Sequence, residues 1–473
     1  MRRALPLGAF LAILFAILGT GTSARAAATF ENITVDNSQA PKQLTFKVTL
    51  SAPADVTEAT LRFRVAGRAS SGIGQPADPI TPARNLTVSV VMQTNTAGNY
   101  IPVGSDITYY WRVQTADGQT TESPDAKFTY LPTGTWRSVG DENVIVYFQG
   151  DREAIARSYV SAATETLDKM ATGVLATALR QKPVKAILFS AERDLELARA
   201  GGPTTHDQSV TNCGTKVSVD VIHLIHVQCG SPDITDTFRH ELTHILTQAA
   251  GSPDLEGALY KAPSWLDEGT AMYGQTGPGQ QLATAQAAAR ANRLIPFSQI
   301  NLANDRANTT ELFYGQSYLM VKFLIDRAGP PKFAEFFATM KKGIAYETAM
   351  KTVYGFDMAG FEKEFLASVG AAGPAATVAP TTRASGSQPT AAPTTRGSGA
   401  QPTAAPTRAP AQDTSDDNSI EGMAIGIFGA AILFGLLGVM AFLISMVLQN
   451  NRKRAAAAGS APPSPGDHRP LDD

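Results

Sequence analysis

The sequence predicts a multidomain chain: an N-terminal all-β sandwich, an α+β domain, a disordered stalk and one C-terminal transmembrane helix. Three observations support this order. Short segments with strand-like alternation occupy residues 28–131, segments with helical spacing dominate residues 132–370, and a run without charged residues lies near the C-terminus. Strands followed by helices are typical of an α+β arrangement, and 473 residues are enough for two or three domains.

The N-terminus has the three parts of a secretory signal peptide. Arg2 and Arg3 precede an apolar run over residues 4–18, and the sequence Ala-Arg-Ala at 24–26 offers a cleavage site. We place the end of the signal peptide at residue 27. A short membrane anchor is the alternative, but the apolar run is too short to span a bilayer comfortably.

Residues 28–131 are predicted to form a β-sandwich. Apolar and polar residues alternate over short segments separated by turn residues, as expected for strands with one buried face. The segment 107–118 resembles the late strands of fibronectin type III or immunoglobulin-like domains. The alternating segments are 44–50, 59–65, 86–91, 107–113 and 127–130.

Residues 132–370 combine a few strands with many helices. Strands are expected at 143–148 and 184–189, with one or two more within 216–228. A helix is expected over about 152–180, and the pattern after residue 228 is helical.

The strongest chemical signal is the sequence His-Glu-Leu-Thr-His at residues 240–244. His240 and His244 are four residues apart, so on a helix they share one face and can reach one zinc ion. Glu241 lies between them and is placed to take a proton from the attacking water. A chance occurrence of this motif on a solvated surface helix is the alternative.

The flanking residues predict that the motif lies on a helix of about eighteen residues. Ser-Pro-Asp at 231–233 is a good helix start, and Gly-Ser-Pro at 251–253 is a good stop. An apolar stripe predicts that one side of this helix is buried. The stripe consists of Phe238, Leu242, Ile245, Leu246 and Ala249.

A catalytic zinc site takes three protein ligands and keeps one position open. Glu268, 24 residues after His244, is the candidate third ligand, within Pro-Ser-Trp-Leu-Asp-Glu-Gly at 263–269. Ser264 is expected to cap a helix, which places Glu268 in its first turn or early in its second. An exposed helix carboxylate is the alternative interpretation of Glu268.

Taken together, His-Glu-x-x-His and Trp-Leu-x-Glu-Gly resemble the gluzincin metallopeptidases, in particular the peptidase-MA-like domains. The resemblance covers roughly residues 140–370. It implies a peptide-bond hydrolase with one Zn²⁺ per chain, Glu268 as third metal ligand, Glu241 as general base and a peptide or protein substrate. Tyr314 matches the catalytic tyrosine of aminopeptidase-type gluzincins, where a phenol can donate to the oxyanion; Tyr318 is the alternative.

The chain also departs from that family. The Gly-Ala-Met-Glu-Asn segment with which its aminopeptidases bind the substrate's α-amine has no match upstream of His240, which argues against an aminopeptidase. Met272 stands where thermolysin-like enzymes have an aspartate, so the sequence does not predict what orients His240. Asp267 is expected to cap or pair locally. The segment 255–262 is expected to form a loop.

His223 and His226 precede the predicted metal helix in a strand segment. Their spacing in a strand puts them on opposite faces, so we expect structural roles for both rather than a shared metal. Cys213 and Cys229 are the only cysteines, and outside the cytoplasm an even pair favours an intrachain disulfide. Because a disulfide needs Cα atoms within about 7 Å, the segment between them would have to double back.

The C-terminal part predicts membrane attachment. Residues 371–418 are of low complexity, and a Pro/Thr/Ala-rich repeat of 13 residues that begins at Pro380 indicates an extended stalk. No charged residue occurs from Gly422 to Leu448, so we place a transmembrane helix at 420–448. Arg452, Lys453 and Arg454 follow, and positive charge marks the cytoplasmic side. We therefore expect a single-pass protein of the cell membrane with a cytoplasmic tail at 449–473.

Two function classes compete. The first is a membrane-anchored, extracytoplasmic zinc peptidase, most simply an endopeptidase. The second is a catalytically inactive surface binding or adhesion protein that keeps the zincin fold as a scaffold. Glu241 favours the peptidase, because a binding protein has no need of a general base. The net charge of −2 gives no reason to expect nucleic acid as a partner.

Overall fold

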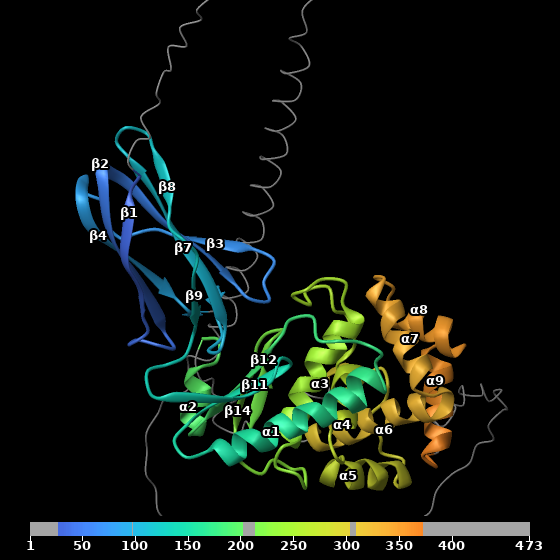
Figure 1. Ribbon diagram of the computed structural model, residues 1–473. Coiled ribbons are helices and arrows are strands. Elements are labelled where there is room, and N and C mark those ends of the chain that lie inside the picture. The colour runs from blue at the N-terminus through green and yellow to red at the C-terminus, as the bar shows by residue number, and fades with distance from the viewer. Residues whose placement is uncertain (1–26, 97, 202–212, 303–308, 372–473) are drawn as a thin grey trace, which may run out of the picture. The chain divides into compact units, whose positions relative to one another are not determined.

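The computed structural model describes residues 27–96, 98–201, 213–302 and 309–371, which belong to one compact unit (Figure 1). The predicted stalk, transmembrane helix and cytoplasmic tail, and all but the last residue of the predicted signal peptide, lie outside these ranges. Within them, no helix combines the length and the apolar character that a membrane span requires.

The N-terminal region is rich in β-structure, as predicted, and its main sheet is antiparallel. A separate two-stranded sheet consists of β5 (Asn95–Thr96) and β6 (Asn99–Tyr100). The seven strands of the main sheet are β1 (Thr29–Asp36), β2 (Gln43–Val65), β3 (Ser71–Gly74), β4 (Ala83–Gln93), β7 (Asp106–Thr115), β8 (Thr120–Glu122) and β9 (Ala126–Thr129).

The long strand β2 joins two parts of this sheet. Residues 43–51 pair with β1 and β4, whereas residues 56–65 pair with β3 and β7. The pairing register shifts between these halves, where Pro53 cannot donate a ladder hydrogen bond. The two alternating segments predicted here are thus one irregular strand.

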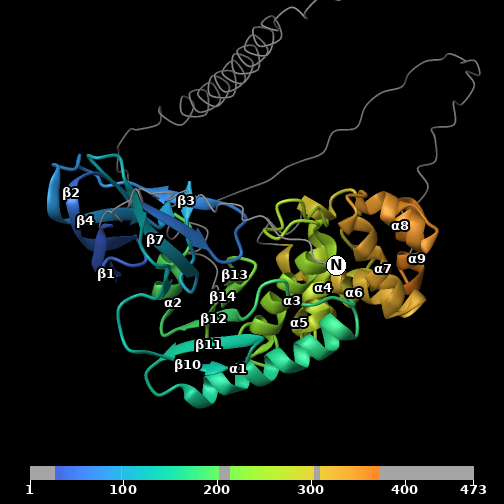
Figure 2. The same cartoon turned by 45° about the horizontal axis from the view of Figure 1, so that its top comes forward.

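The second region contains a mixed sheet of five strands and a set of helices, which confirms the predicted order of a β-rich region followed by a mixed α and β domain (Figure 2). In sheet order the strands are β10 (Trp136–Gly140), β11 (Val144–Gln149), β12 (Val184–Phe189), β14 (Val221–Ile225) and β13 (Gly214–Lys216). The helices are α1 (Glu153–Thr166), α2 (Glu192–Leu197), α3 (Asp236–Gly251), α4 (Ser264–Gly274), α5 (Gly279–Arg290), α6 (Thr310–Ala328), α7 (Pro330–Lys341), α8 (Tyr346–Tyr354) and α9 (Met358–Ser368).

The helix predicted over 152–180 is shorter than expected. After α1 the chain makes a π-helical turn over Leu167–Thr172, and helical structure ends at Gly173. Glycine is a weak helix former, which explains the end at this position. Leu175 and Leu179 are still buried in the core that the helices share, although their backbone is not helical. The apolar spacing in this segment therefore indicated burial and not a helix.

The five-stranded sheet is buried on both faces. Ala186, Leu188, Ile222 and Leu224 belong to the core shared with the helices, whereas their neighbours Ile187, Phe189, Val221 and Ile225 belong to the core of the β-rich region. Successive side chains of a strand point to opposite faces, so β12 and β14 each contribute to both cores. The β-rich region is therefore packed against the sheet rather than held at a distance from it.

Two buried polar groups join the β-rich region to this sheet. The Nζ atom of Lys185 lies 2.9 Å from a carboxylate oxygen of Asp106 and 3.1 Å from one of Asp220. Nε2 of His223 lies 2.8 Å from the carbonyl oxygen of Val103, and burial lowers the pKa of His223 to about 4. His223 is therefore a neutral histidine that donates from Nε2.

Candidate metal centre

Helix α3 carries the first motif and begins at Asp236, after the start predicted at residues 231–233. The carboxylate of Asp233 accepts hydrogen bonds from the backbone and hydroxyl of Thr235, so residues ahead of the helix form a turn instead. The predicted apolar stripe is buried along the length of α3. Its opposite edge presents His240 and His244.

Helix α4 brings Glu268 toward these histidines. Trp265 and Leu266 at its start are fully buried and anchor it in the helical core. A Cβ at Gly269 would lie 2.3 Å from the carbonyl oxygen of Ser317, so only glycine lets α4 approach α6 this closely. Glu268 is the fifth residue of α4 and thus lies in its second turn.

The three predicted metal ligands converge. One ligand atom from each of His240, His244 and Glu268 lies within 4.8 Å of the other two. Oε2 of Glu268 is 3.1 Å from Nε2 of His240 and 3.5 Å from Nε2 of His244. In a tetrahedral zinc site with ligand distances of about 2.0–2.1 Å, neighbouring ligand atoms are about 3.3 Å apart. The donor set and its spacing therefore fit zinc.

The electrostatics of the cluster agree with a site built for a cation. Burial by itself would raise the pKa of Glu268. The charges and hydrogen bonds of His244 and His240 lower it by more, so the pKa of Glu268 lies well below its usual range. Burial by itself would lower the pKa of His244. The nearby carboxylates of Asp267 and Glu268 have the larger effect, so the pKa of His244 is raised well above its usual value. Glu268 is thus an anion, the form in which a carboxylate ligates.

Glu241 and Tyr314 lie beside this cluster. Oε2 of Glu241 accepts a hydrogen bond of 2.7 Å from the backbone N–H of Lys216 on the edge strand β13. The ring of Tyr314, on α6, lies 6.0 Å from the ring of His240. Burial and the carboxylates of Glu268 and Glu241 raise the pKa of Tyr314, which keeps its hydroxyl protonated. Tyr318 instead stacks on Tyr273 at 6.2 Å.

Comparison with protein families gives one match, and it covers these elements. Residues 162–371 match the Peptidase MA superfamily. The matched segment contains the three converging side chains, Glu241 and Tyr314. This match supports, at the level of the superfamily, the resemblance found in the sequence.

Other comparisons add little. No curated protein matches the chain. Among solved structures, wild-type OgpA from Akkermansia muciniphila is similar with 8% identity and a TM-score of 0.18, over 23% of this chain and 30% of OgpA. BC0361, a polysaccharide deacetylase from Bacillus cereus, is similar with 7% identity and a TM-score of 0.15, over 31% of this chain and 43% of that one. The chain thus spans less than a third of the length of OgpA.

Asp267, expected to cap or pair locally, instead contacts His244. Its Oδ2 lies 3.0 Å from Nδ1 of His244, and its Oδ1 accepts from the hydroxyls of Thr247 and Tyr260 at 2.5 and 3.0 Å. Metal-bound histidines generally have such a partner on the second nitrogen. Asp267 therefore lies where it can orient His244 as an ion pair, although the Nδ1 atoms of both His240 and His244 are buried without a hydrogen bond of good geometry among the described residues.

Lys216 is a residue of the site that the sequence did not predict. Its Nζ donates to Oε1 of Gln248 at 2.7 Å, and Nε2 of Gln248 donates to the carbonyl of Glu256 at 2.8 Å. Burial lowers the pKa of the Lys216 ammonium below its usual value, although the nearby carboxylates of Asp267, Glu241 and Glu268 act to raise it. The carboxylate of Glu256 in turn accepts from the backbone N–H of Ala69 at 2.6 Å, so the β-rich region contacts this side of the site.

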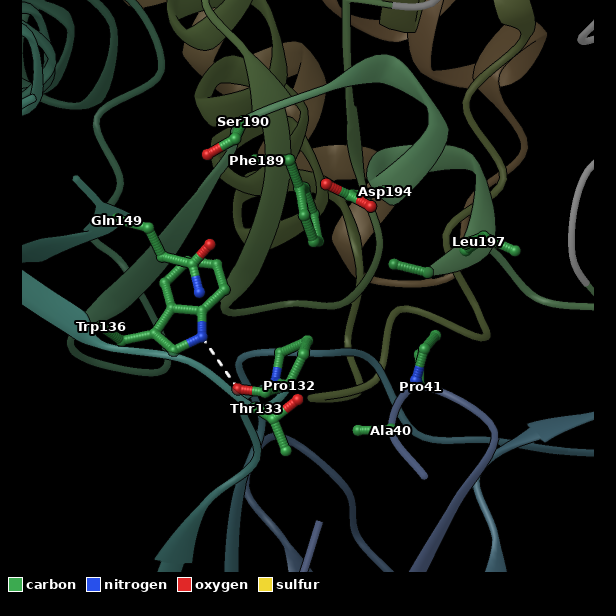
Figure 3. A pocket seen from close by; sticks show the side chains of 11 residues that line it. Ala40, Pro41, Pro132, Thr133, Trp136, Gln149, Phe189, Ser190, Asp194 and Leu197 are labelled. Atoms are coloured by element: carbon green, nitrogen blue, oxygen red, sulfur yellow. Dashed lines mark hydrogen bonds between the residues drawn. The ribbon is translucent and has the colours of Figure 1, made fainter. Parts of the chain in front are cut away.

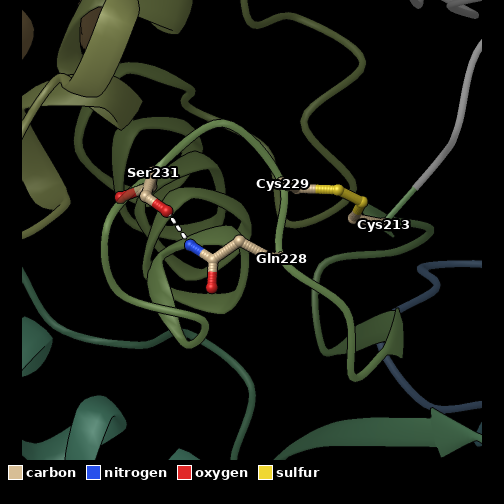
Figure 4. The surroundings of a disulfide bond; sticks show 4 residues. All are labelled: Cys213, Gln228, Cys229 and Ser231. Atoms are coloured by element: carbon tan, nitrogen blue, oxygen red, sulfur yellow. Dashed lines mark hydrogen bonds between the residues drawn. A yellow bond between two sulfur atoms is a disulfide. The ribbon is translucent and has the colours of Figure 1, made fainter.

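The hairpin that carries Lys216 is closed by a disulfide. Strands β13 and β14 run antiparallel, so the segment doubles back, and Cys213 and Cys229 are bonded with Cα atoms 6.4 Å apart (Figure 4). His226 lies outside the metal cluster, with Nδ1 at 3.0 Å from the hydroxyl of Tyr159. His223 faces the β-rich region, so the two histidines serve opposite faces.

A separate pocket of about 210 Å³ lies away from the metal cluster, between residues of the β-rich region and of the five-stranded sheet (Figure 3). Trp136 and Phe189 are edge-to-face with ring centres 6.4 Å apart, and Nε1 of Trp136 donates to the carbonyl of Pro132. None of the three predicted metal ligands lines this pocket.

Proposed function

We propose that this chain is a membrane-anchored, zinc-dependent peptidase that cleaves peptide bonds within protein or peptide substrates outside the cytoplasm. The observation that carries this proposal is the convergence of His240, His244 and Glu268 inside the Peptidase MA domain. Glu241 supports catalysis over a purely structural metal site, because it lies between the two histidines without belonging to the ligand cluster.

In the proposed reaction, His240, His244 and Glu268 would hold one zinc ion, which would supply Lewis-acid chemistry to the scissile carbonyl. Glu241 takes the proton of the attacking water and later delivers it to the leaving amine. The backbone N–H of Lys216 holds the Glu241 carboxylate in place for these transfers. The protonated hydroxyl of Tyr314 donates to the oxyanion that develops on the substrate.

The proposed location rests on the ends of the chain. A signal peptide at 1–27, a stalk at 371–418 and a transmembrane helix at 420–448 would hold the peptidase outside the cell membrane. Protease added to intact cells should remove residues 28 to about 418 and leave a tail detectable by an antibody against its end. An ectodomain that is protected until the cells are lysed would contradict this topology.

Two isosteric variants test the proposed chemistry. Glu241→Gln keeps the shape and removes the base, so zinc content should be retained while turnover falls by about 10²–10⁴-fold. Glu268→Gln removes an anionic ligand and should also weaken zinc binding. Zinc stoichiometry and hydrolysis of a peptide library are measured on both, with Glu335→Gln on the exposed face of α7 as control.

The outcomes separate three cases. If Glu241→Gln cleaves peptides as fast as the parent, the assignment of the base is wrong. If Glu268→Gln binds zinc as tightly as the parent, the ligand set is wrong. If the parent binds zinc but cleaves no peptide in a zinc-dependent manner, a catalytically inactive binding protein replaces the peptidase.

A further inference from the structure

The ammonium group of Lys216 lies beside the metal cluster with hydrogen-bond donors to spare. Lysine has three N–H donors. The contact of Nζ with Oε1 of Gln248 is its one hydrogen bond among the described residues. Among the described residues, two donors of this partly buried ammonium therefore remain without a partner.

The position of this ammonium relative to the metal ligands follows from α3. His240, His244 and Gln248 succeed one another at intervals of four residues, so they lie along one face of the helix. Gln248 is one turn, about 6 Å along the axis, beyond His244. The ammonium that Gln248 holds therefore flanks the metal cluster on the side toward the end of α3.

The same contacts hold the ammonium in place before any ligand arrives. The amide of Gln248 is oriented from both ends, because Oε1 accepts from Lys216 and Nε2 donates to the carbonyl of Glu256. The backbone of Lys216 is held by its hydrogen bond to Glu241 and by strand pairing with Ile222. A preorganised charged group loses little entropy on binding.

The charge balance indicates what such a ligand would be. With zinc bound, the two charges of the ion and the charge of Lys216 would balance the three nearby carboxylates of Glu241, Asp267 and Glu268, so the site would not repel an anionic substrate group. An ammonium with free donors stabilises a carboxylate through charge-assisted hydrogen bonds. It would repel a substrate α-amine held at the same place.

We propose that Lys216, held by Gln248, forms a subsite for a substrate carboxylate close to the scissile bond. This inference rests on the proposed peptidase function and names its substrate class. The carboxylate can belong to an acidic side chain or to the C-terminus of the substrate, and both present the same chemistry to Lys216.

Binding of matched hydroxamates tests this subsite without requiring turnover. Three peptide hydroxamates share one backbone: the first has a free C-terminal carboxylate, the second is its C-terminal amide, and the third is that amide with glutamate in place of a neighbouring glutamine. Calorimetry on the full, zinc-loaded chain in detergent gives their Kd values. We expect at least one carboxylate probe to bind about 10–100-fold tighter than the neutral amide, and the tighter probe identifies the source of the carboxylate.

Variants assign the preference to the charge of Lys216. Lys216→Met should remove the difference between charged and neutral probes, and Lys216→Arg should retain it. Gln248→Leu leaves the ammonium but removes the group that holds it, so the preference should weaken without disappearing, which separates the charge from a merely structural tie between β13 and α3. Lys332→Met, which removes an exposed charge on α7, is the control and should leave all three Kd values unchanged.

The inference is overturned if the parent binds all three probes equally, or if Lys216→Met weakens all three by the same factor. It is also overturned if Gln248→Leu loses the preference as completely as Lys216→Met. A parent that shows the preference but cleaves no peptide would refute the proposed peptidase and leave the subsite standing. A parent that cleaves peptides but binds all three probes equally would do the reverse.

Discussion

Asp267→Asn tests whether the carboxylate behind His244 sets the affinity of the metal centre. In the structure, Oδ2 of Asp267 is 3.0 Å from Nδ1 of His244, while Oδ1 accepts from Thr247 and Tyr260. Asparagine keeps the size of the side chain but removes its charge. It can also turn its amide N–H₂ toward Nδ1, which would favour the tautomer of His244 that cannot ligate through Nε2.

The expected magnitude follows from the role of such partners. Removing the group behind a metal-bound histidine typically costs about 10–100-fold in metal affinity. That corresponds to about 1.4–2.7 kcal/mol of zinc-binding free energy. Tyr260→Phe removes only one donor to the far oxygen of Asp267 and should cost less, because the carboxylate remains charged and close to His244.

Competition with a chromophoric zinc chelator at fixed pH measures this loss directly. Asp326→Asn, at an exposed carboxylate on α6, is the matched control and should leave the zinc Kd unchanged. Thermal unfolding of the zinc-free proteins checks that Asp267→Asn still folds. A zinc Kd for Asp267→Asn within about twofold of the parent would refute the proposed role, since even the lower end of the expected range is about tenfold.

Three further predictions concern other parts of the molecule. Tyr314→Phe should lower kcat by about 10²–10³-fold with unchanged zinc content, and an unchanged kcat would exclude Tyr314 as the oxyanion donor. Zinc at about 100 times its Kd should raise the free energy of unfolding by about 2.7 kcal/mol, and a His240→Ala variant that keeps this gain would contradict the ligand set. The pKa of His223 is about 4 in the folded chain, below its unfolded value, so stability should be complete above about pH 6.5 and fall by about 3 kcal/mol as the pH drops to about 4. Denaturant titrations should show a flatter dependence in His223→Gln, and equal slopes would contradict this origin.

Features with local signals were predictable from the sequence. Two histidines four residues apart must share a helix face, whatever surrounds the helix, because 3.6 residues make one turn. The alternation of apolar residues similarly predicted the strands of the β-rich region, since side chains along a strand alternate between faces. His240 and His244 could therefore be named as a pair, and Glu268 as their partner through the second motif, before any tertiary contact was known.

Boundaries were less predictable, because short-range polar contacts compete with helix formation. Asp233 is a residue type that is common at helix starts. Its carboxylate nevertheless accepts hydrogen bonds from Thr235 in a turn, and α3 begins only at Asp236. Buried residues of irregular backbone can also have the apolar spacing that is typical of a helix. Leu175 and Leu179 have helical spacing but reach the core from irregular backbone.

Only the tertiary structure decided which groups surround the metal ligands and what the β-rich region packs against. Asp267 meets His244, and Lys216 meets both Glu241 and Gln248, across separations of 23 to 32 residues that no periodic pattern encodes. Lys185 and His223 are typical surface residue types, but here they are buried against Asp106 and Val103 of the β-rich region. Backbone geometry relates residues that are a few positions apart, so its consequences can be predicted from the sequence. Contacts between distant segments depend on how whole helices and strands pack, which the sequence pattern does not show.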